Sequence, residues 1–259
     1  MKKLIAIFFV ALLAFGLAAC TEDPEPSYSY GYGVSYGLVH GHYVGVAKVV
    51  VDKDDKVVNV QFEEYYLPYN FAQIVLTEEQ ITTLPADALA VVGSRGTNYY
   101  SKYVSINGTL FTGTVSGESG AQSIKFAASG IADIEVWVET EANAKAYVEG
   151  VEAGTVFIAN ANGTESSYAK ANTNAKIAWT KSASGYWTNP ASYPLGWGGN
   201  MQAIAEALVG TTMDAEEADL VKTTTWSIGD ITTSATLSDF ADYYFLAQVA
   251  YNNALAGKE

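Results

Sequence analysis

The chain has 259 residues with 14 basic and 28 acidic side chains, a formal net charge of −14, and 49% hydrophobic residues. This charge excludes nucleic acid and anionic lipid headgroups as electrostatic partners, and the hydrophobic fraction excludes disorder over most of the length. The length allows one large domain or two small ones, and the 18 Tyr, 10 Phe and 5 Trp favour a β-rich fold with ring-stacking surfaces.

The first residues are typical of a bacterial secretory leader. Lys2 and Lys3 precede an apolar run from Leu4 to Ala19, which is too short to serve as a stable membrane anchor. We therefore predict a signal peptide over residues 1–19.

The leader ends in Leu17-Ala18-Ala19-Cys20, which resembles the lipobox of bacterial lipoproteins. In that family the cysteine thiol receives a diacylglycerol, so the resemblance implies lipidation at Cys20 and an extracytoplasmic protein anchored to the membrane by its lipid. The alternative is an ordinary secreted protein with a chance cysteine at the cleavage site. The sequence has no second cysteine, which excludes an intramolecular disulfide.

Residues 20–37 are predicted to form a flexible tether. They contain Pro24, Pro26 and a stretch rich in Tyr, Gly and Ser, a composition that does not hold a packed structure by itself. Residues 38–259 are expected to form a single globular domain.

The first half of this domain is predicted to be mainly β. Residues 43–51 and 56–66 are rich in β-branched and aromatic side chains and are joined by a polar turn, which indicates a β-hairpin. Thr77 and Gln80 form a capping-box pattern, which indicates a short helix. Two strands are expected around the Asn107-Gly108 turn, and residues 134–138 alternate as a half-buried strand does.

The second half adds helices to this sheet. Residues 141–151 and 200–208 are helix-like, whereas residues 155–158 and 176–180 are strand-like. The predicted class is therefore α+β, with an antiparallel sheet and packed helices.

The last segment predicts a long helix. From Ser238 onward, aromatic and alanine side chains recur at three- and four-residue spacing, which places them on one inward-facing stripe. Ser238 is the predicted N-cap, Asp239 a favourable first-turn anion, and Gly257 the end of the helix.

The residues before this helix resemble a motif of the FMN-binding domain family of bacterial extracytoplasmic flavoproteins. That motif is Asp, two variable residues, Ser or Thr, Gly, Ala and Thr. Asp230, Thr233, Ala235 and Thr236 match it, and Ser234 stands where the family has Gly. The front hairpin and the last helix also resemble this family, together about a third of the chain after the leader.

The resemblance implies a fold, a cofactor and a function. In the family, a flavin transferase moves FMN from FAD onto the last Thr of the motif, so Thr236 would be the acceptor here. The implied function is electron transfer outside the membrane through a bound flavin, with a membrane quinone oxidoreductase or another extracytoplasmic redox protein as partner. Such a protein would be an electron carrier more than a catalyst.

The residues themselves give this placement a physical rationale. A phosphate attached to Thr236 would face the unpaired N–H groups and the positive dipole end of the following helix. An isoalloxazine ring needs a flat apolar wall, which tyrosines, tryptophans and the Gly-rich segment 195–199 could supply.

Two alternatives remain open for the motif. Asp230 to Thr236 could simply be a Thr/Ser-rich loop that caps a helix. The protein would then be a surface lipoprotein that binds a non-redox ligand or another protein at a decayed flavin site, which Ser234 favours. A weaker echo of the motif, residues 119–123, has Gln in place of the acceptor hydroxyl and is expected to be a turn.

Other candidate chemistry is weaker. His40 and His42 could share a face and bind a metal, but the sequence has no third histidine, so an exposed strand start is the preferred interpretation. No Gly-x-Ser-x-Gly elbow supports a catalytic triad. Glu63 and Glu64 are adjacent on a strand and therefore point to opposite faces, which is wrong for a glycosidase pair. We predict no catalytic and no metal-binding residues.

Overall fold

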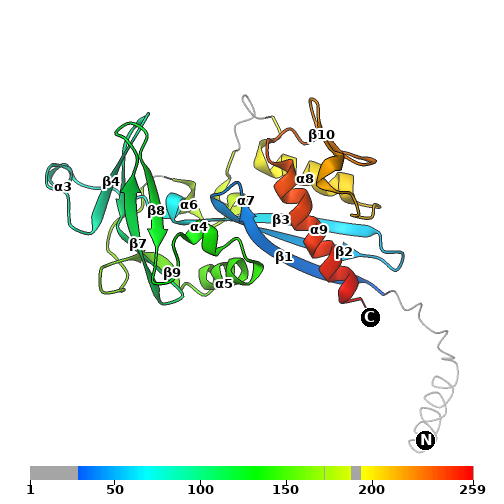
Figure 1. Cartoon of the computed structure of the whole chain (residues 1–259), viewed down its shortest axis with the longest axis horizontal. Coiled ribbons are helices and arrows are strands. Elements are labelled where there is room, and N and C mark those ends of the chain that lie inside the picture. The colour runs from blue at the N-terminus through cyan, green and yellow to red at the C-terminus, as the bar shows by residue number, and fades with distance from the viewer. Residues whose placement is uncertain (1–28, 172, 188–193, 259) are drawn as a thin grey trace, which may run out of the picture.

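The computed structural model describes residues 29–171, 173–187 and 194–258 (Figure 1). Antiparallel sheets and helices are mixed along the chain, so the predicted α+β class is confirmed. The predicted signal peptide and Cys20 lie outside the described residues. Within the described ranges, no helix has both the length and the apolar character needed to cross a membrane.

A three-stranded antiparallel sheet carries the site. Its order is β1-β2-β3, and its strands are β1 (Gly31–Val39), β2 (Tyr43–Val51) and β3 (Val57–Tyr66). The predicted hairpin is confirmed by the β2–β3 pairing, in which Gly45 lies opposite Glu64.

The predicted tether is wrong for residues 31–37, because they form most of β1. The glycines there are needed for close packing: a Cβ at Gly33 would lie 2.0 Å from the carbonyl oxygen of Ala250 in the last helix. The Tyr/Gly alternation that resembles a linker therefore permits a strand to lie directly against a helix.

The second sheet forms the other end of the molecule, together with a separate hairpin (Figure 1). The sheet has the order β8-β7-β6-β9 and contains β6 (Tyr103–Ile106), β7 (Thr109–Ser116), β8 (Ser123–Ala127) and β9 (Val156–Ala159). The hairpin pairs β4 (Ala88–Gly93) with β5 (Gly96–Ser101). The predicted strands around Asn107-Gly108 and near residues 155–158 are confirmed.

The longer helices also match their predictions. They are α5 (Glu141–Glu152), α8 (Gly196–Leu208) and α9 (Phe240–Ala256). Gly257 follows α9 as predicted, and α9 packs along β1 and β2. The capping box of Thr77 and Gln80 is present at the start of a short helix, α3 (Glu78–Thr82).

Two predicted strands are wrong. Residues 134–138 contain the helix α4 (Ile134–Trp137), because the side chain of Asp133 accepts a hydrogen bond from the amide of Glu135 and caps a helical turn. Residues 176–180 begin inside the helix α6 (Asn174–Ile177), and at their end Thr180 forms an isolated antiparallel bridge with Tyr65. In both cases five residues are too few to distinguish the two-residue hydrophobic repeat of a strand from the 3.6-residue repeat of a helix.

Short elements complete the fold. They are α2 (Pro68–Phe71), α7 (Lys181–Ser184), the 3-10 turn η1 (Glu217–Asp219) and a small antiparallel sheet of β10 (Leu220–Lys222), β11 (Trp226–Ile228) and β12 (Ile231–Thr232).

Buried side chains form two clusters, one on each side of the β1-β2-β3 sheet. The first cluster contains β4 to β9 and α5, and the second contains α8, α9 and the segment before α9. Tyr43 and Tyr186 pack against both clusters. These two tyrosines mark the place where the two clusters meet.

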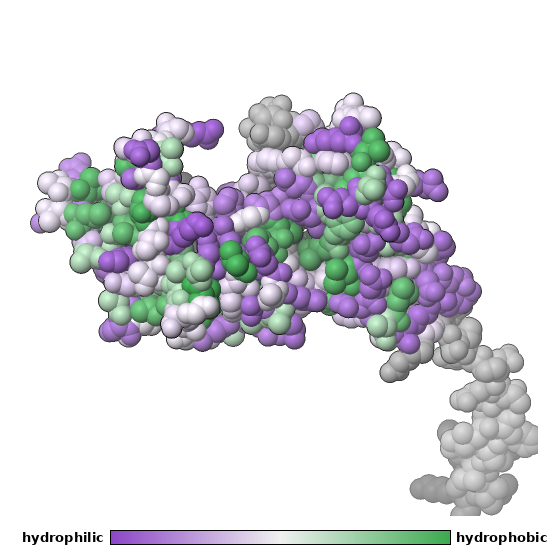
Figure 2. All heavy atoms as spheres, in the orientation of Figure 1, coloured by the Kyte–Doolittle hydropathy of each residue, from purple (hydrophilic) through white to green (hydrophobic). Residues whose placement is uncertain are grey.

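The visible face has several apolar areas, and one of them lies far from this junction (Figure 2). Figure 2 shows hydrophobic residues at the end of the molecule that carries α3, where Val75, Ile81 and Leu84 are exposed. Most of the remaining visible face is a mixture of polar and apolar residues (Figure 2).

Candidate functional site

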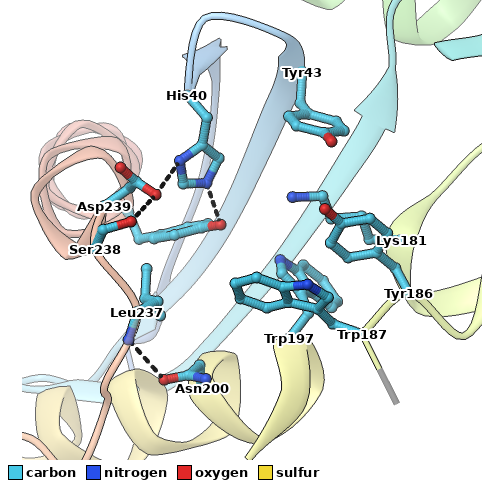
Figure 3. Close-up of a pocket in the computed structure, with 11 residues that line it drawn as sticks. His40, Tyr43, Lys181, Tyr186, Trp187, Trp197, Asn200, Leu237, Ser238 and Asp239 are labelled. Carbon is cyan, nitrogen blue, oxygen red and sulfur yellow. Dashed lines mark hydrogen bonds and ion pairs between the residues drawn. The ribbon is translucent and has the colours of Figure 1, made fainter. Parts of the chain in front are cut away.

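A cavity of about 240 Å³ lies where the two clusters meet (Figure 3). Its walls come from the β1–β2 turn, the start of β2, α7 and the turn after it, the start of α8, and the segment that leads into α9. Five aromatic side chains line it, namely Tyr43, Tyr186, Trp187, Trp197 and Tyr243. The remaining lining residues are His40, Lys181, Asn200, Leu237, Ser238 and Asp239.

Lys181 supplies a buried positive charge to the cavity. It is the first residue of α7, a turn capped by the Thr180 hydroxyl, and only 4% of it is exposed. Its ammonium lies 3.8 Å from the ring centroid of Tyr43 and 4.6 Å from that of Tyr186. Each ring face attracts the cation and partly replaces its water shell.

Glu64 on β3 balances this charge. Its Oε2 lies 2.5 Å from Nζ of Lys181, and its side chain is fully buried. Its Oε1 accepts hydrogen bonds from the Trp197 indole N–H, at 2.6 Å, and from the hydroxyl of Tyr243. The carboxylate is therefore held by three donors from α7, α8 and α9.

A chain of polar contacts links Glu64 to the surface. His40 Nε2 lies 2.5 Å from the Tyr243 hydroxyl, and His40 Nδ1 lies 2.8 Å from Oδ2 of Asp239. Asp239 is about half exposed, whereas His40 is mostly buried. Because the Tyr243 hydroxyl donates to Glu64, His40 Nε2 is placed to donate to that hydroxyl.

Burial and charge shift the pKa values around this chain. Burial alone would raise the pKa of Glu64, but His40 and Lys181 outweigh it and hold the pKa below the ordinary value. Burial lowers the pKa of Lys181. Burial also raises the pKa of both Tyr43 and Tyr243, and nearby Glu64 raises each further. Both tyrosines are therefore neutral at physiological pH.

Asn200 joins the end of the predicted motif to the start of α8 by hydrogen bonds. Its Oδ1 accepts from the amides of Thr236, at 2.7 Å, and Leu237, at 3.3 Å, and its Nδ2 donates to the carbonyl oxygen of Gly196 (Figure 3). Gly196 has φ +59°, and a Cβ there would lie 2.2 Å from the Trp187 carbonyl oxygen. The Gly-rich start of α8 is thus shaped by close backbone contacts.

None of the five predicted cofactor-binding residues is among the described residues that line the cavity. Asp230 and Ser234 are exposed, Ala235 is fully buried, and Thr233 is buried with its hydroxyl accepting from the Ala235 amide at 3.0 Å. Thr236 is exposed, and the next three residues, 237–239, are part of the cavity wall.

The backbone of Ser234 does not have the positive φ that would favour glycine. The non-glycine residues with positive φ in the described part of the chain are His40, Asp55, Asn107 and Trp187. The backbone of Ser234 therefore tolerates a Cβ, which removes one physical reason for the glycine of the family motif.

The predicted N-cap of the last helix is wrong by one residue. Asp239, not Ser238, is the N-cap residue, and its carboxylate points to His40 and Ser238 instead of to the helix amides. No side chain caps the first turn of α9. Its N–H groups therefore remain without a side-chain acceptor.

The interpretation of the two histidines as an exposed strand start holds for His42, which is exposed and directly precedes β2, and is wrong for His40. Both lie in the β1–β2 turn, where His40 has φ +53° and turns its ring inward. His42 is exposed, stacks on Tyr69 and lies 2.7 Å from Glu135. The described residues contain no group of three or more His, Cys, Asp or Glu side chains suited to a metal ion.

Two other sequence interpretations are confirmed. Residues 119–123 connect β7 and β8 as a turn. Glu63 and Glu64 point to opposite faces of β3: Glu64 is buried beside α9, whereas Glu63 accepts from the amide of Ser182 at 3.2 Å.

Sequence reasoning missed Glu64, Lys181 and Asn200. Glu64 alternates in phase with Val60 and Phe62, so the period of β3 places it on a buried face. A carboxylate in such a position needs a buried partner and is a site candidate. Lys181 and Asn200 carry no comparable local signal, because Glu64 and the amide of Thr236, which they bind, are more than 30 residues away in sequence.

No known protein family, curated protein or solved structure matched the chain when it was compared with them. The chemistry of the site is therefore inferred from its own side chains.

Proposed function

We propose that the protein is an extracytoplasmic lipoprotein that binds FMN beside Thr236 and carries electrons outside the membrane. The observation that carries the proposal is the position of Thr236: an exposed hydroxyl next to a segment that lines an aromatic cavity. The fold is then a variant of the FMN-binding domain.

The cavity suits the ring of such a cofactor. At about 240 Å³ it is somewhat smaller than the pockets of about 300–1,000 Å³ that hold whole drug-sized ligands. It therefore accommodates a flat ring system and leaves the ribityl phosphate outside. The aromatic walls supply stacking surfaces, and the lining amide of Asn200 and ammonium of Lys181 supply polar contacts.

The first turn of α9 suits the phosphate. Its amides have no side-chain cap, and the helix dipole adds partial positive charge at that point. A phosphoryl group on Thr236 would lie four residues before Phe240, the first residue of α9. FMN, when bound, supplies the redox chemistry, and the chain supplies position, exclusion of water and charge.

The test is attachment of flavin to Thr236. The full chain is produced with a flavin transferase of the extracytoplasmic type, denatured, and examined for in-gel flavin fluorescence and for the mass of the adduct. We expect a fluorescent band in the wild type and none in Thr236→Ala. Thr232→Ala is the matched control, because Thr232 is also exposed and lies four residues earlier. A wild-type band without fluorescence contradicts covalent attachment.

The lipid anchor is tested in the same preparation. Mass spectrometry of the mature chain should report a diacylglycerol adduct on Cys20, and Cys20→Ala should move the protein from the membrane fraction to the soluble fraction. The anchor would raise the local concentration of redox partners on the membrane. An unmodified mature N-terminus in the wild type contradicts the anchor.

A second function is favoured by one observation, namely that none of the five motif residues lines the cavity. In that case the aromatic cavity binds a non-redox aromatic ligand and the motif only shapes the loop. Purified protein that remains free of flavin with the transferase and with added FMN would support this function and reject electron transfer.

A further inference from the structure

The ammonium of Lys181 faces the cavity, whereas its counterion does not line it. Among the described lining residues, Lys181 is the only Lys or Arg, and Figure 3 shows its ammonium directed inward between Tyr43 and Trp197. Its counterion, Glu64, does not line the cavity and lies behind it on β3. A ligand in the cavity therefore meets the ammonium before it meets the carboxylate.

Other ionisable groups also lie around the Lys181 ammonium. The Glu64 carboxylate is already held by Tyr243 and Trp197 in addition to Lys181. Asp239 also lines the cavity, with its carboxylate 2.8 Å from His40 Nδ1, but the Asp239 side chain is 45% exposed, so water screens its charge. Tyr43 and Tyr243 stay neutral because burial and nearby Glu64 raise the pKa of each.

Reduction changes the charge of a flavin. Uptake of two electrons and one proton leaves the ring with one net negative charge at neutral pH. A fixed cation in a site shielded from water attracts such an anion more strongly than it would in bulk solution. The oxidised ring carries no net charge, so the same cation attracts it less than it attracts the reduced ring.

We propose that Lys181, held by Glu64, Tyr43 and Tyr186, is the residue that makes the cavity bind reduced flavin more tightly than oxidised flavin. This inference rests on the proposed function. It assigns Lys181 the role of setting the redox potential of the carrier, with Glu64 moderating the effect.

The test varies the two charges separately. Unmodified protein, made without flavin transferase, is titrated anaerobically with oxidised FMN and with dithionite-reduced FMN, and binding is followed by tryptophan fluorescence. The variants are Glu64→Gln, which leaves the ammonium without its counterion, Lys181→Met, which removes it, and the double variant. The measured quantity is the ratio of the two dissociation constants, oxidised over reduced.

We expect the ratio to rise in Glu64→Gln and to fall in Lys181→Met, by about tenfold in each case, which corresponds to about 30 mV in a two-electron potential. The double variant should lie between wild type and Lys181→Met. Lys170→Met is the matched control, because the Lys170 ammonium also lies on an aromatic ring, that of Trp179 at 4.1 Å, but does not line the cavity. Its ratio should equal that of the wild type.

The outcomes separate the two proposals. FMN binding with the same ratio in all variants overturns the role of Lys181 and leaves the flavin function in place. Failure of the unmodified wild-type protein to bind either form of FMN overturns the role of Lys181, and the flavin function is overturned as well only if the transferase also leaves the protein without flavin. If Lys181→Met does not fold, the double variant decides, because it leaves no unpaired buried charge; a wild-type ratio in the double variant rejects the role of Lys181.

Discussion

The ammonium of Lys181 lies 2.5 Å from the Glu64 carboxylate, and both side chains are almost completely shielded from water. Removing one partner of a buried pair leaves an uncompensated charge, which costs about 3–5 kcal/mol. We expect Lys181→Met to lower the free energy of unfolding by about this amount. The Glu64→Gln/Lys181→Met double variant should be more stable than Lys181→Met, as measured by urea denaturation. Equal stabilities would contradict the pairing.

The Glu64 carboxyl also predicts sensitivity to acid. Its pKa is held below the ordinary value of 4.5 in the folded state, so its stabilising contribution is present above pH 4.5 and is lost as pH falls through the folded pKa. We expect urea midpoints to decrease below pH 4.5 more steeply in wild type than in Glu64→Gln. Parallel curves for the two proteins would show that this carboxyl does not contribute.

His42 predicts a change in stability at higher pH than Glu64 does. Its hydrogen bond to Glu135 raises its pKa above 6.5 in the folded state. Its stabilising contribution is therefore complete below pH 6.5 and is lost as pH rises through the folded pKa. The pair is half exposed, so the effect on stability is small, about 0.2–1 kcal/mol.

Nuclear magnetic resonance checks this directly. The sequence has two histidines, and the signal that disappears in His42→Gln is that of His42. The His42 signal should titrate above pH 6.5 in wild type and move toward 6.5 in Glu135→Gln. A His42 signal that titrates at the same pH in both proteins would count against the pair.

Asn200 is expected to control the motif segment. Its side chain satisfies the amides of Thr236 and Leu237, and it is 3% exposed. Asn200→Ala leaves these donors without their partner, at a cost of about 1–3 kcal/mol for each buried group. We expect a lower melting temperature and less flavin on Thr236. Gln202→Ala, on the exposed side of the same helix, should match wild type in both measurements.

Gly33 is expected to tolerate no side chain. A Cβ there would lie 2.0 Å from the Ala250 carbonyl oxygen and 2.4 Å from the Ala254 amide, so β1 and α9 would have to separate. Gly33→Ala should destabilise the protein by about 1–3 kcal/mol or more. In the control Gly37→Ala, the new Cβ has an ordinary contact of 3.4 Å with Leu246. Equal melting temperatures for the two variants would contradict close packing at Gly33.

Elements with several agreeing local signals could be predicted from the sequence. The β2–β3 hairpin has two periodic strands and a polar turn, and α9 has a regular aromatic and alanine stripe. The short helices α4 and α6 could not be predicted, because one helical turn is decided by a cap such as Asp133 and by neighbouring elements. Residues 31–37 resembled a linker because their glycines serve packing that only the tertiary structure reveals.

The candidate site also combines residues that the sequence could indicate with residues that it could not. Thr236 is a hypothesis from a local motif, and the structure places it exposed, directly before three residues that line the aromatic cavity. The charged centre of the cavity could not be predicted, because Glu64, Lys181 and Tyr243 come from separate elements that only folding brings together. His40 was judged from its neighbours in sequence, which gave no sign that its ring turns toward α9.

The nine residues of β1 also determine how far the cavity stands from the start of the described chain. At about 3.3 Å for each residue, the β1–β2 turn with His40 lies about 30 Å from Gly31. Gly31 lies against Ala254 near the C-terminal end of α9, whereas the cavity is lined by residues 237–239 just before α9. In a protein fastened to a bilayer through Cys20, the first end of β1 therefore sits nearer the lipid and the cavity opens farther out. A soluble protein could then dock at the cavity and exchange electrons without pressing against the headgroups.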